Sequence, residues 1–154
     1  MKEKIVITYG TFDLFHIGHL NILKRAKELG DKLIVAVSTD DFNAIKGKSV
    51  IIPYEQRVQI VRNIKCVDEV IPEKDWKQKK SDINKYSVDI FVMGDDWKGE
   101  FDELNAYCKV VYLERTEGVS SSGLKKSLKQ IVSTPPQQLR EAVDVIERLL
   151  KDLE

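Results

Sequence analysis

The two histidines of the chain are the residues best suited to chemistry, because both lie in the segment from Gly10 to His19. His16 and His19 are three residues apart, so both rings lie on one face if they begin a helix. Gly18 between them leaves room for a large ligand group to approach the backbone. A helix start favours an anion, and two imidazoles there can donate hydrogen bonds to phosphate oxygens as negative charge builds. The spacing therefore indicates chemistry on a phosphate group.

The histidine pair allows two other interpretations. His16 could cap the helix while His19 lies in the core, which is the commoner situation for a single histidine. A metal site would need further ligands, and no third histidine, cysteine or carboxylate stands at a recognisable ligand spacing. Because both histidines of the chain flank one glycine, we favour the phosphate site over these alternatives.

A second anion-binding segment is predicted at 115–122, directly after an apolar run. The guanidinium of Arg115 offers a fixed fork of donors for phosphate. Gly118, Ser120 and Ser121 can form a turn whose N–H and hydroxyl groups point at the same anion. An ordinary helix start capped by serine is the alternative. We prefer the anion site because this segment ends a strand at the same sheet edge as the histidines.

Lysines form two further basic clusters. Lys46 and Lys48 lie in a polar loop that is not a P-loop, since Phe42 stands where that motif has its first glycine. Trp76 and Lys79 belong to the second cluster. A solvated surface is the alternative for both clusters.

A carboxylate follows the fourth apolar run, where Asp96 stands two residues after Gly94. Such a carboxylate can accept hydrogen bonds from a base amino group or a ribose hydroxyl. A catalytic acid pair with Asp95, as in glycosidases, is disfavoured because side chains at adjacent positions diverge. The position of Asp96 is therefore compatible with binding of a nucleoside.

The candidate residues follow elements that alternate along the chain. Continuous apolar runs predict five buried strands at 5–9, 33–37, 67–71, 90–93 and 110–113, with Pro72 ending the third. Helical spacing of apolar residues predicts helices at 18–29, around 58–64 and at 122–132. This alternation is typical of an α/β fold with a doubly wound, parallel five-stranded sheet and helices on both faces. Ligands bind beyond the carboxyl ends of such strands, where we expect the candidate residues to meet.

Length and composition restrict the class of protein. A chain of 154 residues that is 42% apolar has room for one domain with a real core. Its 25 basic and 25 acidic side chains balance, which argues against a nucleic-acid partner. No run reaches the ~18 apolar residues of a membrane helix and no signal-peptide pattern is present, so no membrane partner is expected. Cys66 and Cys108 lie far apart and suit a reducing compartment, so we expect a cytoplasmic protein.

The C-terminal segment differs in composition from the rest of the chain. Two prolines in 133–136 predict a linker that ends a domain at 1–132. Residues 137–154 predict an amphipathic helix with a stripe made of Leu139, Ala142, Val143, Ile146, Leu149, Leu150 and Leu153. This stripe is compatible with packing on the domain's own surface and with pairing in a dimer.

The segment GTFDLFHIGH resembles the HxGH signature of the nucleotidyltransferase superfamily, which includes class I aminoacyl-tRNA synthetases. Over about residues 4–130 the chain is more similar to the small bacterial glycerol-3-phosphate cytidylyltransferases. The shared blocks are ITYGTFD, Ser-Thr-Asp at 38–40, YEQR at 54–57, VDEVIPEKDW at 67–76, IFVMGDDW at 90–97 and RTEGVSS at 115–121. Six blocks in order lead us to expect a Rossmann-like nucleotidyltransferase domain.

The resemblance implies transfer of CMP from CTP to sn-glycerol 3-phosphate by a homodimer, giving CDP-glycerol and pyrophosphate for teichoic acid or capsule biosynthesis. It implies four catalytic side chains that also bind CTP: His16, His19, Lys46 and Arg115. It implies further CTP-binding residues at the strand ends: Gly10, Thr11, Phe12, Gly18, Gly94, Asp96, Thr116, Ser120 and Ser121. For the acceptor it implies Lys79 on the phosphate, with Trp76, Asp13 and Asp40 as further substrate-binding residues. Mg²⁺ would be held mainly by the CTP triphosphate, without a protein metal site.

The chain departs from the family pattern at a few positions. Ser121 and Ser122 stand where the family has threonines, which preserves the hydroxyl groups. Lys65 stands where the family commonly has arginine, so the charge is kept and the bidentate fork is lost.

Two rival functions stay open at this point. One is a sister nucleotidyltransferase that uses ethanolamine phosphate, another polyol phosphate or ATP. The other is a non-catalytic nucleotide-binding module. A fragment of an aminoacyl-tRNA synthetase is disfavoured by the length of the chain and by the lack of a KMSKS-like lysine loop.

Overall fold

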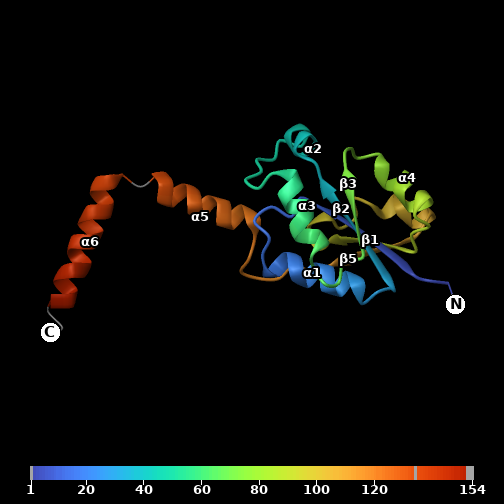
Figure 1. Cartoon of the computed structure of the whole chain (residues 1–154), viewed down its shortest axis with the longest axis horizontal. Coiled ribbons are helices and arrows are strands. Elements are labelled where there is room, and N and C mark those ends of the chain that lie inside the picture. Colours follow the sequence, from blue (N-terminus) through green and yellow to red (C-terminus); the bar gives the residue numbers. More distant parts are fainter. Residues whose placement is uncertain (1, 134, 152–154) are drawn as a thin grey trace. The chain divides into compact units, whose positions relative to one another are not determined.

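The computed structural model describes residues 2–133 and 135–151, and it contains a five-stranded sheet (Figure 1). The strands are all parallel and lie in the order β3-β2-β1-β4-β5. Their bounds are close to the predicted ones: β1 Ile5–Gly10, β2 Lys32–Ser38, β3 Glu69–Glu73, β4 Ile90–Gly94 and β5 Lys109–Leu113. The prediction of a doubly wound, parallel five-stranded sheet is confirmed.

Helices cover both faces of this sheet (Figure 1). The chain forms α1 Ile17–Lys27, α2 Asp40–Ile45, α3 Tyr54–Arg62, α4 Gln78–Lys85, α5 Ser121–Ser133 and α6 Pro136–Lys151, with 3₁₀ turns at Asp95–Trp97 and Asp102–Ala106. Of these helices, α1, α3 and α4 contribute to the core on the two faces of the sheet. Leu23 of α1 and Val61 of α3 belong to the core on one face, and Ile83 of α4 belongs to the core on the other. The central strands are continuously apolar because both of their faces are covered.

The order of the strands reverses between β1 and β4. The chain adds β2 and then β3 on one side of β1, and it crosses back to add β4 and β5 on the other side. Because β1 and β4 are parallel neighbours, their carboxyl ends lie side by side. In open sheets this is the place where ligands bind. The topology therefore brings the residues after Gly10 close to those after Gly94.

Two local predictions were wrong. Pro72 does not end the third strand, since β3 continues to Glu73. β3 is an edge strand, where the missing N–H of a proline needs no partner. The polar loop before Pro53 and the lysine-rich segment after β3 contain the helices α2 and α4. The helix α2 has only six residues and α4 has a single apolar residue, so neither shows an apolar periodicity in the sequence.

The chain divides into two compact units, Met1–Ser121 and Ser122–Glu154. The predicted linker at 133–136 lies partly outside the described residues, because Thr134 is not among them. The helix α6 begins at Pro136, a first helical position at which proline needs no N–H partner. The predicted domain boundary at residue 132 stays a prediction. Within the described ranges, no helix is long and apolar enough to cross a membrane.

Arg57 of α3 is fully buried and ties together three connections at the carboxyl edge of the sheet. Its Nη1 donates to the carbonyl oxygens of Thr11 at 2.6 Å and Ser38 at 2.8 Å. Its Nε donates to the carbonyl oxygen of Ile52 at 2.8 Å, and its Nη2 pairs with Asp40 Oδ1 at 2.6 Å. One side chain thus fixes the loop after β1, the end of β2 and the loop before α3.

We predict that Arg57→Ala lowers the free energy of unfolding by about 3 kcal/mol, because buried carbonyl oxygens lose their donor. Urea denaturation followed by circular dichroism measures this change. Arg62→Ala, at the exposed end of the same helix, is the matched control and should stay within about 0.5 kcal/mol of wild type. Equal urea midpoints for the two variants would contradict the role assigned to Arg57.

Candidate active site

A cavity opens at the carboxyl edge of the sheet, where β1 meets β4. Its lining comes from the strand ends, the following loops and the start of α1: Thr8, Tyr9, Gly10, Thr11, Phe12, His16, Gly18, His19, Ile22, Met93, Gly94, Asp96, Trp97, Glu114, Arg115, Thr116 and Val119. Of the thirteen residues predicted to bind CTP, ten belong to this lining. The other three are Lys46, Ser120 and Ser121.

His16 and His19 begin α1 and cap it reciprocally. His16 is the N-cap, and its Nδ1 accepts a hydrogen bond from the N–H of Gly18 at 3.0 Å. The Nδ1 of His19 accepts from the N–H of His16 at 3.2 Å, and the two rings stack with centroids 3.9 Å apart. A neutral imidazole that accepts at Nδ1 carries its proton at Nε2. The Nε2–H group of each ring is therefore the one that faces Ser121 Oγ in this structure and that can turn to a ligand instead.

The surroundings hold both histidines in the neutral form. Burial and repulsion from His16 lower the pKa of His19 to about 4. Partial burial and the nearby Arg115 lower the pKa of His16. Ser121 Oγ lies 3.3 Å and 3.4 Å from the two Nε2 atoms and donates to the carbonyl oxygen of Asp13 at 2.8 Å. Two neutral N–H donors and a guanidinium at one cavity can stabilise a growing negative charge.

The loop between β1 and α1, which leads to the histidines, contains two residues with strained backbone. Phe12 and Leu14 have φ angles of 54° and 48°, in the left-handed region that non-glycine residues rarely adopt. Asp13 between them is buried and accepts hydrogen bonds from the N–H groups of Ile51 at 2.8 Å and Ile52 at 2.9 Å. The loop before α3 thus fixes the loop that carries the histidines.

The ends of β4 and β5 bring two opposite charges to the cavity. Arg115 Nη1 lies 3.7 Å from Asp96 Oδ2, and both side chains are about half exposed. A Cβ at Gly94 would lie 2.6 Å from Asp96 Oδ1, so a larger residue at this position would displace the carboxylate. Asn21 of α1 donates to Thr116 Oγ1 at 3.1 Å. An anionic group can bind Arg115 while Asp96 accepts from a hydroxyl or amino group of the same ligand.

A second cluster of charges lies at the ends of β2 and β3. Glu73 is 3% exposed and accepts hydrogen bonds from Lys79 Nζ at 2.7 Å and from Ser38 Oγ at 2.5 Å. Lys46 Nζ donates to Ser38 Oγ at 3.0 Å and lies 3.9 Å from Glu73 Oε2. Burial lowers the pKa of Lys46 to about 8, while the charge of Glu73 acts in the opposite direction. Two ammonium groups therefore share one buried carboxylate.

Aromatic rings join this lysine cluster to the histidine cavity. Lys79 Nζ lies 4.7 Å from the ring centre of Tyr9 and 4.9 Å from that of Trp76. Lys46 Nζ lies 5.6 Å from the ring centre of Trp76. Tyr9 and Trp97 line the cavity, and the rings of Trp76 and Trp97 are 5.8 Å apart. The lysines and the histidines therefore belong to adjoining parts of one site.

Several predicted substrate-binding residues are engaged by the protein itself. Asp13 holds the loop before α3, and Asp40 pairs with Arg57. Lys79 is 3% exposed, with its ammonium group on Glu73. Contact of these three side chains with a substrate stays a prediction.

Glu73 and Ser38 are site residues that the sequence analysis did not single out. Both end strands, one residue beyond Pro72 and Val37 respectively. Their place at a strand end, where ligands bind in such sheets, was the one signal that could have found them. Nothing in the sequence pairs Glu73 with either lysine.

A family model described as cytidylyltransferase-like matches residues 7–147. The glycerol-3-phosphate cytidylyltransferase of Bacillus subtilis is 58% identical over 125 residues, which make up 81% of this chain and 97% of that relative. The corresponding enzyme of Staphylococcus aureus is 57% identical, with 81% and 95% covered. The ethanolamine-phosphate cytidylyltransferase of Arabidopsis thaliana is 37% identical, over 80% of this chain and 32% of that protein.

A solved structure has the same fold. The lipopolysaccharide core biosynthesis protein of Thermoplasma volcanium superposes with a TM-score of 0.66 at 28% identity, over 75% of this chain and 100% of that one. The family model spans most of this chain, and the bacterial relatives match nearly their whole length. The chain belongs to the cytidylyltransferase-like family and groups within it with the glycerol-3-phosphate cytidylyltransferases.

Proposed function

We propose that the chain transfers CMP from CTP to sn-glycerol 3-phosphate, giving CDP-glycerol and pyrophosphate. One observation carries the chemistry: two neutral imidazole N–H donors and a guanidinium line the same cavity at the switch point of the sheet. The choice of substrates is supported by the relatives named glycerol-3-phosphate cytidylyltransferase, which are 57% and 58% identical to this chain.

In the proposed reaction an oxygen of the acceptor phosphate attacks the α-phosphorus of CTP. The bond between that phosphorus and the oxygen bridging to the β-phosphate breaks, and its electron pair leaves with pyrophosphate. A phosphate monoester is already an anionic nucleophile at neutral pH, so no side chain has to remove a proton. The Nε2–H groups of His16 and His19 donate to the oxygens that gain charge, and Arg115 neutralises the remainder. Catalysis then rests on positioning and on charge stabilisation.

The lysine cluster combines Lys79, which the resemblance places on the acceptor phosphate, with Lys46, which it places on CTP. Lys46, Lys79 and Glu73 together leave one positive charge beside the cavity. That charge attracts the acceptor phosphate and repels a cationic head group. The cluster therefore favours a phosphate carried by a neutral alcohol, such as glycerol, over ethanolamine phosphate.

The Mg²⁺ implied by the resemblance would be held mainly by the triphosphate of the nucleotide. In the part of the chain that the structure describes, no three histidine, cysteine or carboxylate side chains gather in a way that could hold a metal. Triphosphate oxygens and water are suitable ligands for Mg²⁺. When bound, the ion would neutralise part of the negative charge of the triphosphate.

The proposal includes the remaining expectations from the resemblance. The product would enter teichoic acid or capsule biosynthesis, and the chain would act as a homodimer in the cytoplasm. Neither nucleic acid nor a membrane would be a partner.

Release of pyrophosphate by the purified chain tests the proposed function. CTP or ATP is combined with glycerol 3-phosphate, ethanolamine phosphate or another polyol phosphate, in the presence of Mg²⁺. We expect the fastest release from CTP with glycerol 3-phosphate. Release from another pair alone would contradict the choice of substrates, whereas binding of CTP without release from any pair would favour a non-catalytic module.

The state of the two histidines can be measured by NMR, because the chain has no others. We predict that both rings are neutral at pH 7 with the proton at Nε2, and that His19 titrates near pH 4 in the free protein. CTP should raise both pKa values, because a triphosphate anion stabilises the imidazolium. His16→Asn assigns the signals. Proton location at Nδ1, or unchanged pKa values at saturating CTP, would contradict the proposed role.

The buried carboxylate gives a prediction with a pH signature. Glu73→Gln removes the negative charge that keeps Lys46 protonated, so the pKa of Lys46 should fall further below its value of about 8. We expect kcat/KM for glycerol 3-phosphate to fall about 10-fold at pH 8, and by less at pH 6.5, where Lys46 regains its proton. Steady-state kinetics at the two pH values measure the difference.

Glu69→Gln on the same strand is the matched control, since Glu69 pairs with the surface residue Lys32 at 2.8 Å. It should leave the kinetics unchanged at both pH values. An equal loss of kcat/KM for Glu73→Gln at pH 6.5 and pH 8 would instead indicate that the carboxylate of Glu73 has a purely structural role.

A further inference from the structure

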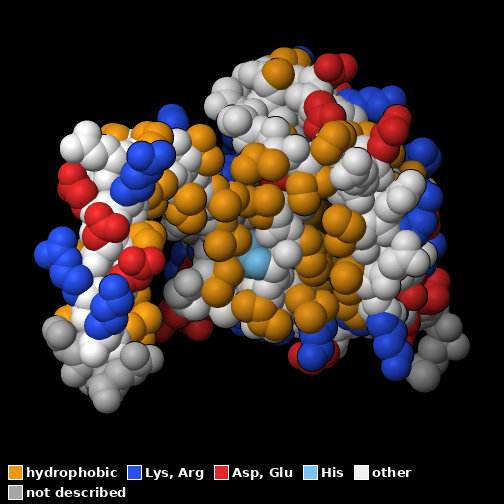
Figure 2. All heavy atoms as spheres, turned by 60° about the vertical axis from the view of Figure 1, so that its left-hand side comes forward, with side chains coloured by type: hydrophobic (Ala, Val, Ile, Leu, Met, Phe, Trp, Pro, Cys, Tyr) orange, Lys and Arg blue, Asp and Glu red, His pale blue; other side chains and the backbone are white. Residues whose placement is uncertain are grey.

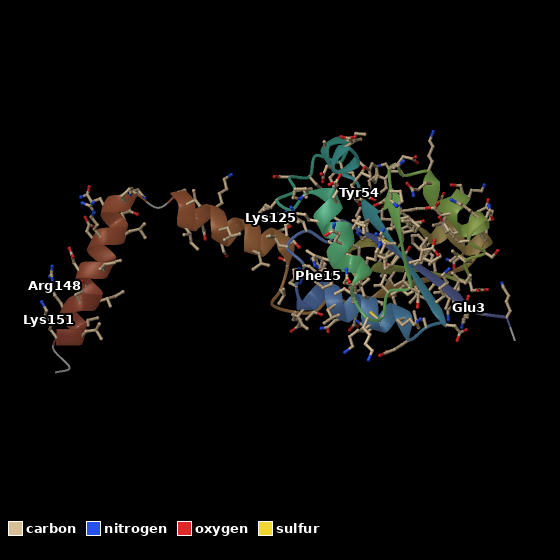
Figure 3. The ribbon with its side chains drawn as sticks, viewed as in Figure 1. Glu3, Phe15, Tyr54, Lys125, Arg148 and Lys151 are labelled. Carbon is tan, nitrogen blue, oxygen red and sulfur yellow. The ribbon has the colours of Figure 1, made fainter. Side chains whose placement is uncertain are left out.

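The C-terminal helix α6 carries an exposed apolar stripe, which we call the seam. No described residue of this helix is buried. The seam consists of five large side chains that are each between 49% and 59% exposed: Leu139, Val143, Ile146, Leu149 and Leu150. Figure 2 shows hydrophobic side chains along one side of this helix and charged ones along the other. Arg148 and Lys151 project from the same side of the helix (Figure 3).

The seam needs a partner to be stable. A helix of 16 residues is marginal in water by itself, and most helical stability in proteins comes from burying an apolar face. The last sequence block shared with the family ends at Ser121, and the match that covers 97% of the Bacillus relative takes in 81% of this chain. The family model extends into α6, as far as residue 147. No described residue of α6 belongs to the lining of the cavity, so its seam is suited to a role other than the catalytic chemistry.

The charges of α6 argue against a membrane surface as that partner. Helices that lie on membranes carry an excess of lysine and arginine on the polar face, with tryptophan or phenylalanine on the other. Residues 136–151 contain three basic and three acidic side chains and no aromatic residue. A neutral polar face flanking an aliphatic seam is typical of a helix that pairs with another helix.

The spacing of the seam defines a coiled-coil register. Four of its residues follow one another at intervals of four, three and four: Leu139, Val143, Ile146 and Leu150. This alternation keeps one face toward a partner helix. Arg140 and Glu147 lie beside these four residues on one side, and Ala142 and Leu149, the fifth residue of the seam, lie beside them on the other.

We propose that α6 pairs in antiparallel orientation with the α6 of a second copy of this chain. In this arrangement Val143 packs opposite Ile146 of the second copy. Leu139 packs opposite Leu150 of the second copy. The two-fold axis then sets Arg140 opposite Glu147 of the second copy, once at each end. A parallel pair would place Glu147 beside Ala142 of the second copy, without an ion pair. Charge complementarity therefore selects the antiparallel orientation.

Charge reversal in the full chain tests this pairing. Arg140→Glu or Glu147→Arg alone places like charges opposite each other twice, and we expect the Kd of the α6-dependent association to rise about 10-fold at low salt. The double variant R140E/E147R should restore the wild-type Kd. Arg148→Glu, on the polar side, is the control and should leave it unchanged. Sedimentation equilibrium measures Kd, and circular dichroism checks that each variant keeps its helix content.

Cysteine cross-linking tests the orientation. A mixture of Val143→Cys and Ile146→Cys chains should form a disulfide-linked dimer on mild oxidation, and neither variant should do so alone. The wild-type chain, with Cys66 and Cys108, gives the background. Cross-linking of Val143→Cys with itself would overturn the antiparallel pair. A double charge variant that fails to restore association, or binding to anionic vesicles without self-association, would overturn the pairing as a whole.

Discussion

The hydrogen bonds that His16 and His19 make to the start of α1 determine how the active site is built. Each Nδ1 is occupied by a backbone N–H of the helix itself, so the proton of each neutral ring lies at Nε2. The chain must reach this helix from β1 through left-handed backbone at Phe12 and Leu14. That conformation persists because Asp13 binds the loop before α3. The site is therefore preorganised by bonds within the protein.

Anion binding in this protein depends on local arrangement and not on net charge. The chain has 25 basic and 25 acidic side chains, and its two histidines are neutral in the free protein. Positive charge is nevertheless concentrated at the carboxyl edge of the sheet, where two ammonium groups share the single carboxylate of Glu73. Burial strengthens these interactions because water screens them less. A neutral protein can thus hold a site for highly charged phosphates.

The two units of the chain differ in the burial of their apolar side chains. The sheet buries its strands on both faces and fixes the site at the switch point. The helix α6 instead carries a seam of exposed apolar side chains, which is suited to association. Of the two roles that the apolar stripe allowed, pairing with a second copy agrees better with the positions of Arg140 and Glu147. Catalysis and association would then reside in separate segments of one short chain.

The sequence by itself determined the fold class, the histidine pair and the segments that supply the cavity, because continuous apolar runs and glycine-flanked motifs are local patterns. Other features depend on contacts between segments and could be seen only in the tertiary structure. The sequence pattern could not predict that β3 continues past Pro72, because only the strand order shows that β3 is an edge strand. In the structure Glu73 binds both Lys79, six residues away, and Lys46, from a distant segment. The buried guanidinium of Arg57 likewise binds the carbonyl oxygen of Thr11, which is far away in the sequence. Charge pairing, burial and the tautomer of an imidazole depend on neighbours in space, and the order of residues along the chain does not specify those neighbours.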